Sequence, residues 1–190
     1  MRTLKLQVQV SIDGYVAGPN GEMDWMVWNW DEELKNYVKE LTGTIDCIIM
    51  GRKLAAGFIP YWATVAENPD DPQYSFGLTM SETPKIVFSK SPRPSSWHNT
   101  KVTAGDLVEV IKDLKNQEGK DIIVYGGGSF VSSLIKADLI DEYHLFINPA
   151  ALGDGMTIFK RLTHKQPFRL IKSLASTCGI VVICYEPHRE

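Results

Sequence analysis

The sequence predicts a single α/β domain covering residues 1-190, with a mixed, mainly parallel central sheet flanked by helices and antiparallel strands near the C-terminus. Strand-like apolar runs alternate with helical patterns as far as about residue 147, which is typical of a parallel sheet. Two further strand-like runs, 169–174 and 180–185, follow without a helix between them and predict an antiparallel pair. An apolar fraction of 44% in 190 residues is sufficient for one hydrophobic core.

Residues 4–12 alternate between apolar and polar side chains and therefore predict a strand with one buried face. The glycine-rich stretch 11–21 predicts a long loop at the C-terminal end of that strand. A helix is expected next, because Asp31 or Asn29 can cap its N-terminus and Gly43 can end it. Its apolar face has helical spacing and consists of Leu34, Tyr37, Val38 and Leu41.

Residues 45–50 are apolar on both faces, as expected of a central strand. A short helix is expected over about 51–56. Residues 57–83 contain prolines and several acidic residues without clear periodicity, so we interpret them as a long functional loop or flap. Short strands are predicted at 85–89 and 101–103.

The stretch 106–109 resembles a capping box that opens a helix, whose buried side is formed by Leu107, Val110, Ile111 and Leu114. A strand is predicted at 122–125. Ser129 can then cap a second helix that runs to about Ala137, and residues 142–147 predict a further strand.

The composition excludes several functional classes. The net charge is −3 and the pI is near 5.8, so the chain has no basic field that would attract nucleic acid or an anionic membrane. The N-terminus shows no signal-peptide pattern, and no apolar run approaches the ~20 residues that span a bilayer. Three cysteines lie in apolar runs and predict reduced, buried thiols in a cytoplasmic protein: Cys47, Cys178 and Cys184. No cysteine or histidine spacing indicates a metal site.

Two glycine-marked turns, at 51–53 and 126–130, each follow a strongly apolar strand. Glycine permits positive φ angles and close approach of the backbone to a ligand. A helix that begins after such a turn presents free N–H groups and a positive dipole end, where phosphates bind. Two such turns in one domain indicate a long anionic ligand, and a dinucleotide fits better than a single phosphate. Local positive charge is available from Arg52, Lys53, Lys90 and Arg93.

The motifs resemble a known family. Three strand-terminal motifs occur in the order and spacing of dihydrofolate reductases: Met50-Gly51-Arg52-Lys53, Ser89-Lys90-Ser91-Pro92 and Gly126-Gly127-Gly128. The Asp13-Gly14 loop and the segments 138–145 and 149–155 are more similar to the reductase domain of bacterial riboflavin-biosynthesis enzymes. The resemblance covers nearly the whole chain. It points to the dihydrofolate-reductase-like superfamily, in the branch formed by the C-terminal domain of bifunctional deaminase–reductases.

This resemblance implies NADPH as the cofactor and assigns roles to matching residues. The pyrophosphate region would be held by Gly51, Arg52, Lys53 and Leu54. The adenosine 2′-phosphate would contact Ser89 and Lys90. The coenzyme backbone would pass close to Gly126, Gly127, Gly128, Ser129 and Phe130, with the nicotinamide near Val10 and Trp25. The position of Tyr125 would contact substrate. From their place in the 57–83 segment, Tyr61 and Trp62 are candidate walls of the substrate site.

The candidates for supplying the proton are Asp13, Glu33 or an ordered water. Asp13 lies in the loop that would close over the active site, although Asp-Gly is also a common turn former. Glu33 lies near the place of the first-turn carboxylate of dihydrofolate reductases, although acids are common in any first helical turn. Riboflavin-pathway reductases commonly carry a glutamate where Tyr125 stands. The zinc signature of a deaminase half is absent from the sequence.

The implied function is that of an NADPH-dependent oxidoreductase. It would transfer hydride to a C=N or C=O bond of a small pteridine- or pyrimidine-like or ribosyl-linked substrate, similar to 5-amino-6-(5-phosphoribosylamino)uracil reductase. Two alternatives stay open: a dihydrofolate reductase proper, and a non-catalytic nucleotide-binding module. Related domains are typically dimers, so a homodimer is expected, with Trp28 and Trp30 in the core or at the interface.

Overall fold

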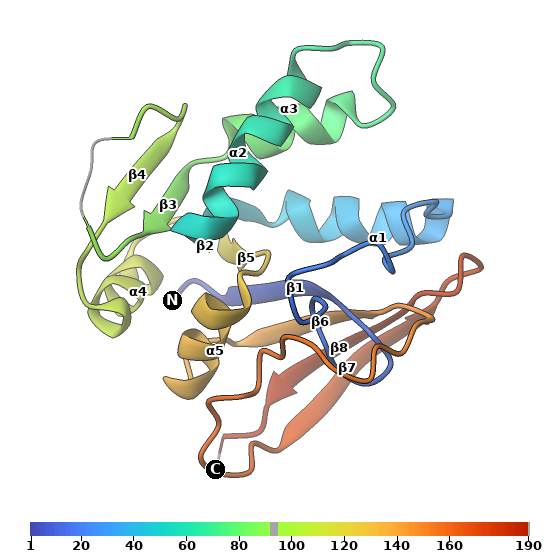
Figure 1. Ribbon diagram of the computed structural model, residues 1–190. Coiled ribbons are helices and arrows are strands. Elements are labelled where there is room, and N and C mark those ends of the chain that lie inside the picture. Colours follow the sequence, from blue (N-terminus) through green and yellow to red (C-terminus); the bar gives the residue numbers. More distant parts are fainter. Residues whose placement is uncertain (92–94, 190) are drawn as a thin grey trace.

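The computed structural model describes residues 1–91 and 95–189 (Figure 1). Arg93 and the end of the turn predicted near Lys90 therefore lie outside the described residues. The strands are β1 (Leu4–Val10), β2 (Ile45–Gly51), β3 (Lys85–Phe88), β4 (Thr100–Thr103), β5 (Asp121–Val124), β6 (Glu142–Ile147), β7 (Phe168–Ala175) and β8 (Val181–Pro187). The helices are α1 (Glu32–Gly43), α2 (Arg52–Ala66), α3 (Tyr74–Glu82), α4 (Leu107–Asn116) and α5 (Gly128–Lys136).

The strands form one eight-stranded sheet in the order β4-β3-β2-β5-β1-β6-β8-β7. The strands from β4 to β6 in this order pair in parallel, and β8 and β7 add an antiparallel hairpin at one edge. This arrangement confirms the predicted α/β class and the predicted antiparallel C-terminal pair. Among the described residues, no helix is long and apolar enough to cross a membrane.

Helices cover both faces of the sheet (Figure 1). One core lies beneath α1, α2 and α3 and includes Leu34, Ile59 and Met80. The other lies beneath α4 and α5 and includes Ile111 and Leu134. The parallel crossovers therefore place α1 and α2 on one side of the sheet and α4 and α5 on the other, as the right-handed rule requires for connections running in opposite directions along the sheet.

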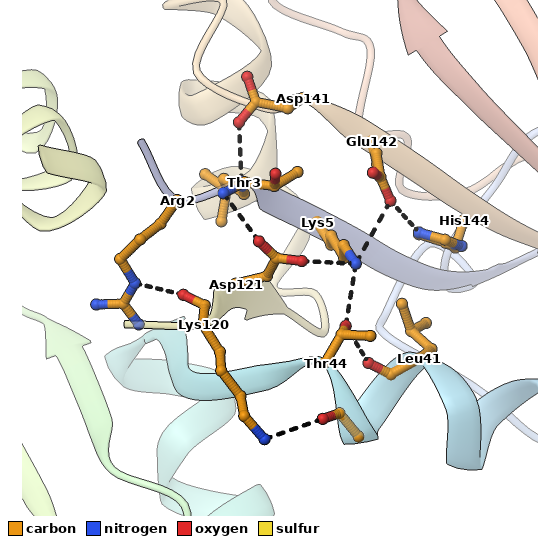
Figure 2. Close-up of polar contacts among 12 residues, drawn as sticks. Arg2, Thr3, Lys5, Leu41, Thr44, Lys120, Asp121, Asp141, Glu142 and His144 are labelled. Atoms are coloured by element: carbon orange, nitrogen blue, oxygen red, sulfur yellow. Dashed lines mark hydrogen bonds and ion pairs between the residues drawn. The ribbon is translucent and has the colours of Figure 1, made fainter. Parts of the chain in front are cut away.

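Strand β1 is buried on both faces, and the expectation of a single buried face was wrong. Its polar residues Lys5 and Gln7 are only 8% and 7% exposed. The cause is the position of β1 between β5 and β6, with helices above and below. Lys5 is accommodated because its ammonium lies 2.8 Å from Asp121 Oδ2 and donates to Thr44 Oγ1 at 3.0 Å (Figure 2).

The interpretation of residues 57–83 as a loop was wrong. Helix α2 continues through Pro60 to Ala66, and α3 follows. Pro60 is tolerated because both it and Ala56, whose carbonyl loses its helical donor, lie on the exposed side of the helix. Gly77 allows α3 to pack closely on α2, since a Cβ there would lie 2.7 Å from Val65 Cγ1.

The helix caps agree with the sequence in two of three cases. Asp31 caps α1 by accepting from the backbone N–H of Leu34 at 2.9 Å, and Asp106 caps α4. The expectation for Ser129 was wrong, because α5 already begins at Gly128 and its N-cap is Gly127. Ser129 therefore lies within the first helical turn.

The cysteines are free thiols. Cys47 and Cys184 are buried, as expected, whereas Cys178 is only half-buried in the turn between β7 and β8. Burial raises the pKa of the Cys47 and Cys184 thiols to about 11.

Candidate functional site

Strand β5 ends earlier than the strands on either side of it. Val124, its last residue, pairs with Ile49 of β2 and Leu6 of β1, and both of those strands continue beyond this level. At this point the chain leaves β5 toward α5 on one face, whereas β2 leads to α2 on the other. In open α/β sheets, ligands bind at such a reversal, outside the C-terminal strand ends.

The two glycine-marked turns contact each other at this reversal. A Cβ added at Gly51 would lie 3.2 Å from Cβ of Phe130, and one at Gly127 would lie 3.8 Å from Cβ of Leu54. The loop after β1 joins them, because a Cβ at Gly128 would lie 3.6 Å from Val16 Cγ2. The structure therefore brings together residues from β2–α2, β5–α5 and the β1 loop.

The turn after β5 requires glycine for its backbone conformation. Gly126 has φ of 142° and Gly127 has φ of 83°, and L side chains rarely adopt such angles. A Cβ added at Gly126 would meet nothing within 4 Å, so open space adjoins this residue. The turn thus combines an unusual backbone with room for a ligand.

Helices α2 and α5 differ from α1 and α4 in how they begin. Asp31 and Asp106 cap α1 and α4, whereas α2 and α5 follow Gly51 and Gly127 and have no side-chain cap. The first N–H groups of a helix have no partner inside it. The two helices whose N-termini meet at the end of β5 therefore present N–H groups and positive dipole ends to a ligand.

A third turn lies beside the Gly51 turn. Phe88, the last residue of β3, pairs with Gly51, and its ring lies 5.1 Å from the ring of Phe130. Ser89 follows directly, and its hydroxyl donates to the carbonyl of Ser91 at 2.9 Å. Basic side chains at these turns are exposed, and within residues 1–91 and 95–189 they form no ion pair with a carboxylate: Arg52, Lys53 and Lys90.

The residues expected near a nicotinamide lie on the β1 side of this edge. Val10 is buried at the end of β1, and its carbonyl accepts from the backbone N–H of Asn148 at 2.8 Å. Trp25 is half-buried in the segment before α1, and its indole N–H donates to the carbonyl of Glu22 at 3.1 Å.

Asp13 is bound by three neighbouring groups. Its carboxylate accepts from Ser11 Oγ at 2.6 Å and from the backbone N–H groups of Gly153 at 2.7 Å and Leu152 at 3.0 Å. These hydrogen bonds, the one from Ser11 foremost, lower the pKa of Asp13 to about 2. The ionised carboxylate ties two loops together and is poorly suited to donate a proton at neutral pH. Glu33 is exposed in the first turn of α1.

An aromatic layer lines α2 and the end of β5. Tyr125 stacks on Phe58 with ring centroids 5.5 Å apart, and Phe58 contacts Trp62 at 6.1 Å. Trp62 in turn contacts Tyr61 at 4.9 Å; Tyr61 is 54% exposed. The predicted substrate residues thus form one surface. Sequence reasoning missed Phe58, because helix α2 had been interpreted as a loop from residue 57.

The Tyr125 hydroxyl is buried and has no hydrogen-bond partner among the described residues. Burial raises the pKa of Tyr125 well above its ordinary value, so the hydroxyl stays protonated. An unpaired buried hydroxyl is unfavourable in the free protein. Its position directly after β5 makes it a candidate donor to a ligand that reaches it.

Sequence reasoning also missed Asn148, which is fully buried after β6. Its amide nitrogen donates to Gln9 Oε1 at 2.7 Å and to the Phe146 carbonyl at 3.1 Å, and its oxygen accepts from the Val27 backbone N–H. The sequence offered one signal for this residue, since Asn148 is polar and stands between the apolar strand β6 and Pro149.

A surface hollow of about 450 Å³ lies elsewhere, near the N-terminal ends of β2, β3 and β4. Its lining includes Arg2, Asp46 and Lys85. Because the glycine turns lie at the opposite ends of these strands, this hollow is separate from the candidate site.

The fold is that of a dihydrofolate reductase. Over 98% of this chain, the structure aligns with 97% of the dihydrofolate reductase from Enterococcus faecalis complexed with NADP(H), at 14% identity and a TM-score of 0.61. The chain belongs to the RibD C-terminal domain family, whose model matches residues 2–182.

Relatives support the same assignment. The chain is 31% identical over 188 residues to the uncharacterized protein YyaP of Bacillus subtilis, covering 97% of this chain and 94% of that protein. It aligns with 99% of a putative riboflavin biosynthesis protein from Shewanella sp. PV-4 over 98% of its own length, at 26% identity and a TM-score of 0.72. It also aligns over 98% of its length with 57% of a Thermotoga maritima deaminase/5-amino-6-(5-phosphoribosylamino)uracil reductase, at 18% identity and a TM-score of 0.70.

Proposed function

We propose that this protein is an NADPH-dependent oxidoreductase. It transfers hydride to a C=N or C=O bond of a small pteridine- or pyrimidine-like or ribosyl-linked substrate, in a reaction similar to that of 5-amino-6-(5-phosphoribosylamino)uracil reductase. The observation that carries the proposal is the meeting of two uncapped helix N-termini, α2 and α5, at the end of β5. Membership of the RibD C-terminal domain family supports it.

The residues present fit a dinucleotide. Free N–H groups, the open space over Gly126 and the exposed cations suit a pyrophosphate. In the proposal, the phosphates are held by Gly51, Arg52, Lys53, Leu54, Gly126, Gly127, Gly128, Ser129 and Phe130. Ser89 and Lys90 contact the 2′-phosphate, and Val10 and Trp25 lie beside the nicotinamide. When bound, NADPH supplies the hydride.

The chain's own residues orient the reactants and exclude water. Tyr61, Trp62 and Tyr125 provide a wall against which a planar ring can pack. Asp13 holds the neighbouring loops together, and its low pKa argues against its use as an acid. Glu33 or a water molecule is then the source of the proton.

The position of Tyr125 distinguishes this chain from the riboflavin-pathway pattern. A neutral hydroxyl stands where those reductases commonly carry a glutamate, so substrate is recognised here without that negative charge. We therefore propose a reductase whose substrate shares a heterocyclic ring with the riboflavin precursors and differs in the groups around it.

We also propose that the protein acts in the cytoplasm as a homodimer. Large exposed apolar side chains are consistent with an interface; Trp28, Leu170 and Ile171 are 63%, 55% and 49% exposed. Size-exclusion chromatography with light scattering tests the dimer, and a monomer at micromolar concentration contradicts it.

The function is tested by calorimetric titration with NADPH and NADH, followed by a reduction assay with riboflavin precursors, pterins and dihydrofolate. The expected result is tighter binding of NADPH than of NADH and NADPH-dependent reduction of a pyrimidine- or pterin-like compound other than dihydrofolate. Equal binding of both coenzymes contradicts the role of Ser89 and Lys90. Reduction of dihydrofolate with methotrexate inhibition indicates a dihydrofolate reductase, and NADPH binding without any reduction indicates a nucleotide-binding module.

A further inference from the structure

A second cluster of reactive side chains lies beneath α1, away from the glycine turns. Glu142 and His144 are two residues apart on β6 and face the same side of the sheet, and Cys184 of β8 pairs with His144. His144 Nε2 lies 3.1 Å from Glu142 Oε2 and 4.0 Å from Cys184 Sγ. All three ligand atoms lie within 4.8 Å of one another. His144 and Cys184 are 6% and 4% exposed.

We propose that Glu142, His144 and Cys184 form a binding site for a divalent transition-metal ion, with Zn²⁺ as the preferred ion. Zinc binds imidazole nitrogen, thiolate sulfur and carboxylate oxygen at about 2.0–2.3 Å in a tetrahedral arrangement. An ion placed between these three atoms reaches all of them after small side-chain shifts. The mixed nitrogen, sulfur and oxygen set disfavours Mg²⁺ and Ca²⁺, which take oxygen ligands.

The histidine ring is held in an orientation suited to coordination. The Tyr37 hydroxyl of α1 lies 2.7 Å from His144 Nδ1, and the two rings meet edge to face. Metal-binding histidines commonly use their second nitrogen in such a contact, which fixes the tautomer. In the metal-bound state Nδ1–H would donate to the Tyr37 hydroxyl, which leaves the Nε2 lone pair for the ion. Nε2 is the ring nitrogen that faces Glu142 (Figure 2) and lies 4.0 Å from Cys184 Sγ.

Gln7, on the neighbouring strand β1, is the candidate for a fourth ligand. It lies on β1 in register with His144, on the face beneath α1, and is 7% exposed. Its Oε1 atom is buried and has no hydrogen-bond partner among the described residues. A buried acceptor without a donor is unfavourable in the protein interior. Because Gln7 is in register with His144, its unpaired amide oxygen is our candidate for the fourth metal ligand.

The charges around the cluster suit a divalent cation. The Lys5 ammonium lies 3.8 Å from Glu142 Oε2, but it lies nearer to Asp121, at 2.8 Å (Figure 2). Asp121 and Glu142 share the Lys5 ammonium, so the two carboxylates and the one ammonium leave a net charge of −1 beside the site. Cys184 contributes a further negative charge when the metal displaces the thiol proton to solvent, forming the metal–sulfur bond and releasing one H⁺. The Glu142 side chain is 34% exposed and opens a route to the site.

The test uses Co²⁺ as a spectroscopic probe and Zn²⁺ as a competitor, with the full-length protein under reducing conditions. One equivalent of Co²⁺ should produce thiolate-to-cobalt charge-transfer absorption and tetrahedral d–d bands, and Zn²⁺ should abolish both. Excess Zn²⁺ at about a hundred times Kd should raise Tm by roughly 5–10 °C. Protons released on binding are measured by titration in buffers of different ionisation enthalpy.

Variants separate coordination from packing. Cys184→Ala should remove the charge-transfer band, and Cys178→Ala, which alters a half-buried thiol outside the cluster, should retain it. Tyr37→Phe should retain the band and weaken Zn²⁺ binding by roughly 10- to 100-fold, as expected for loss of an orienting partner. The proposal is overturned if the wild-type protein gives no charge-transfer band, or if Cys184→Ala retains the band of the wild type. NADPH titrations are run separately, because metal binding here does not depend on the proposed reductase function.

Discussion

The side-chain oxygen of Asn148 accepts a 2.8 Å hydrogen bond from the backbone N–H of Val27. This bond joins the end of β6 to the segment that precedes α1, although the two residues are 121 positions apart. The same amide donates to Gln9 on β1, so one buried side chain holds three segments at the C-terminal edge of the sheet. The contact anchors the segment that contains Trp25, two residues before Val27.

Asn148→Ala should therefore destabilise the protein and disturb the site. Loss of the amide leaves buried polar groups unpaired, and we expect the free energy of unfolding to fall by about 1–3 kcal/mol. Urea unfolding measures this change. Asn36→Ala, on the exposed side of α1, is the matched control and should have little effect. Equal stability of the two variants would contradict the role assigned to Asn148.

Gly127→Ala should impair folding and coenzyme binding together. The φ of 83° at this position is unfavourable for alanine by about 1–2 kcal/mol. Because Gly127 is the N-cap of α5, a change of its backbone conformation would displace the start of that helix. Gly57→Ala is the control, and its effect on stability should be the opposite. Gly57 lies in α2, and a Cβ there meets nothing within 4 Å. That substitution should stabilise the helix by about 0.5–1 kcal/mol. Tm and NADPH affinity are measured for both, and unchanged NADPH affinity in Gly127→Ala argues against binding at this turn.

Arg52→Ala should weaken NADPH binding with little change in Tm. The side chain is exposed at the uncapped start of α2, and a charge-assisted hydrogen bond to phosphate contributes about 1.5–3 kcal/mol, or roughly tenfold or more in Kd. Isothermal titration at two salt concentrations measures the loss, which should shrink at high salt. Lys112→Ala, on the exposed surface of α4, should leave Kd unchanged. An equal loss of stability and binding would point to structural damage.

Asp13→Asn should lower Tm relative to the wild type at neutral pH, and this difference in Tm should disappear in acid. The pKa of Asp13 is lowered from 3.8 to about 2, so its ionised form is favoured in the folded state. The stabilisation is therefore present above about pH 4 and disappears as the pH falls through 2. Melting curves of the wild type, Asp13→Asn and the exposed control Asp24→Asn between pH 2 and 7 test this window. A difference between wild type and Asp13→Asn that does not depend on pH would show that the charge plays no part.

Tyr125→Phe should separate stability from function. Removing a buried hydroxyl that has no partner should leave Tm unchanged or raise it, because its desolvation is unfavourable in the free protein. If the hydroxyl donates to the substrate, the KM of the substrate should rise while the Kd of NADPH stays the same. Tyr61→Phe, whose hydroxyl belongs to an exposed residue, is the control. An unchanged KM would remove Tyr125 from substrate recognition.

Much of the fold could be predicted because local patterns and tertiary packing agree. The strand at 142–147 was predicted from the sequence, and capping chemistry narrowed the N-cap of α1 to Asp31 or Asn29, of which the structure has Asp31. The prediction for residues 57–83 was wrong because prolines and glycine are typical of loops. In the structure, Pro60 lies on the exposed face of α2 and Gly77 makes a helix–helix contact, so packing overrides the local signals.

The parts of the candidate site that require glycine could be predicted from the sequence. The residues whose roles depend on long-range contacts could not. Gly51 and Gly127 mark turns that the sequence shows directly, and the structure brings these turns into contact. Asn148 and Phe58 could not be found in the same way, since their roles depend on partners more than 60 residues away in the sequence, Val27 and Tyr125. The pairing of His144 with Cys184 likewise depends on strand register across 40 positions.

Helices α2 and α5 cover opposite faces of the sheet, yet their N-termini lie close together, since a Cβ added at Gly127 would be 3.8 Å from Leu54 Cβ. A coenzyme that accepts hydrogen bonds from both helices would link the hydrophobic core beneath α1, α2 and α3 to the core beneath α4 and α5, on the other face of the sheet. Saturating coenzyme should then make hydrogen exchange slow in concert on the two sides, so that the domain opens as one cooperative unit instead of two.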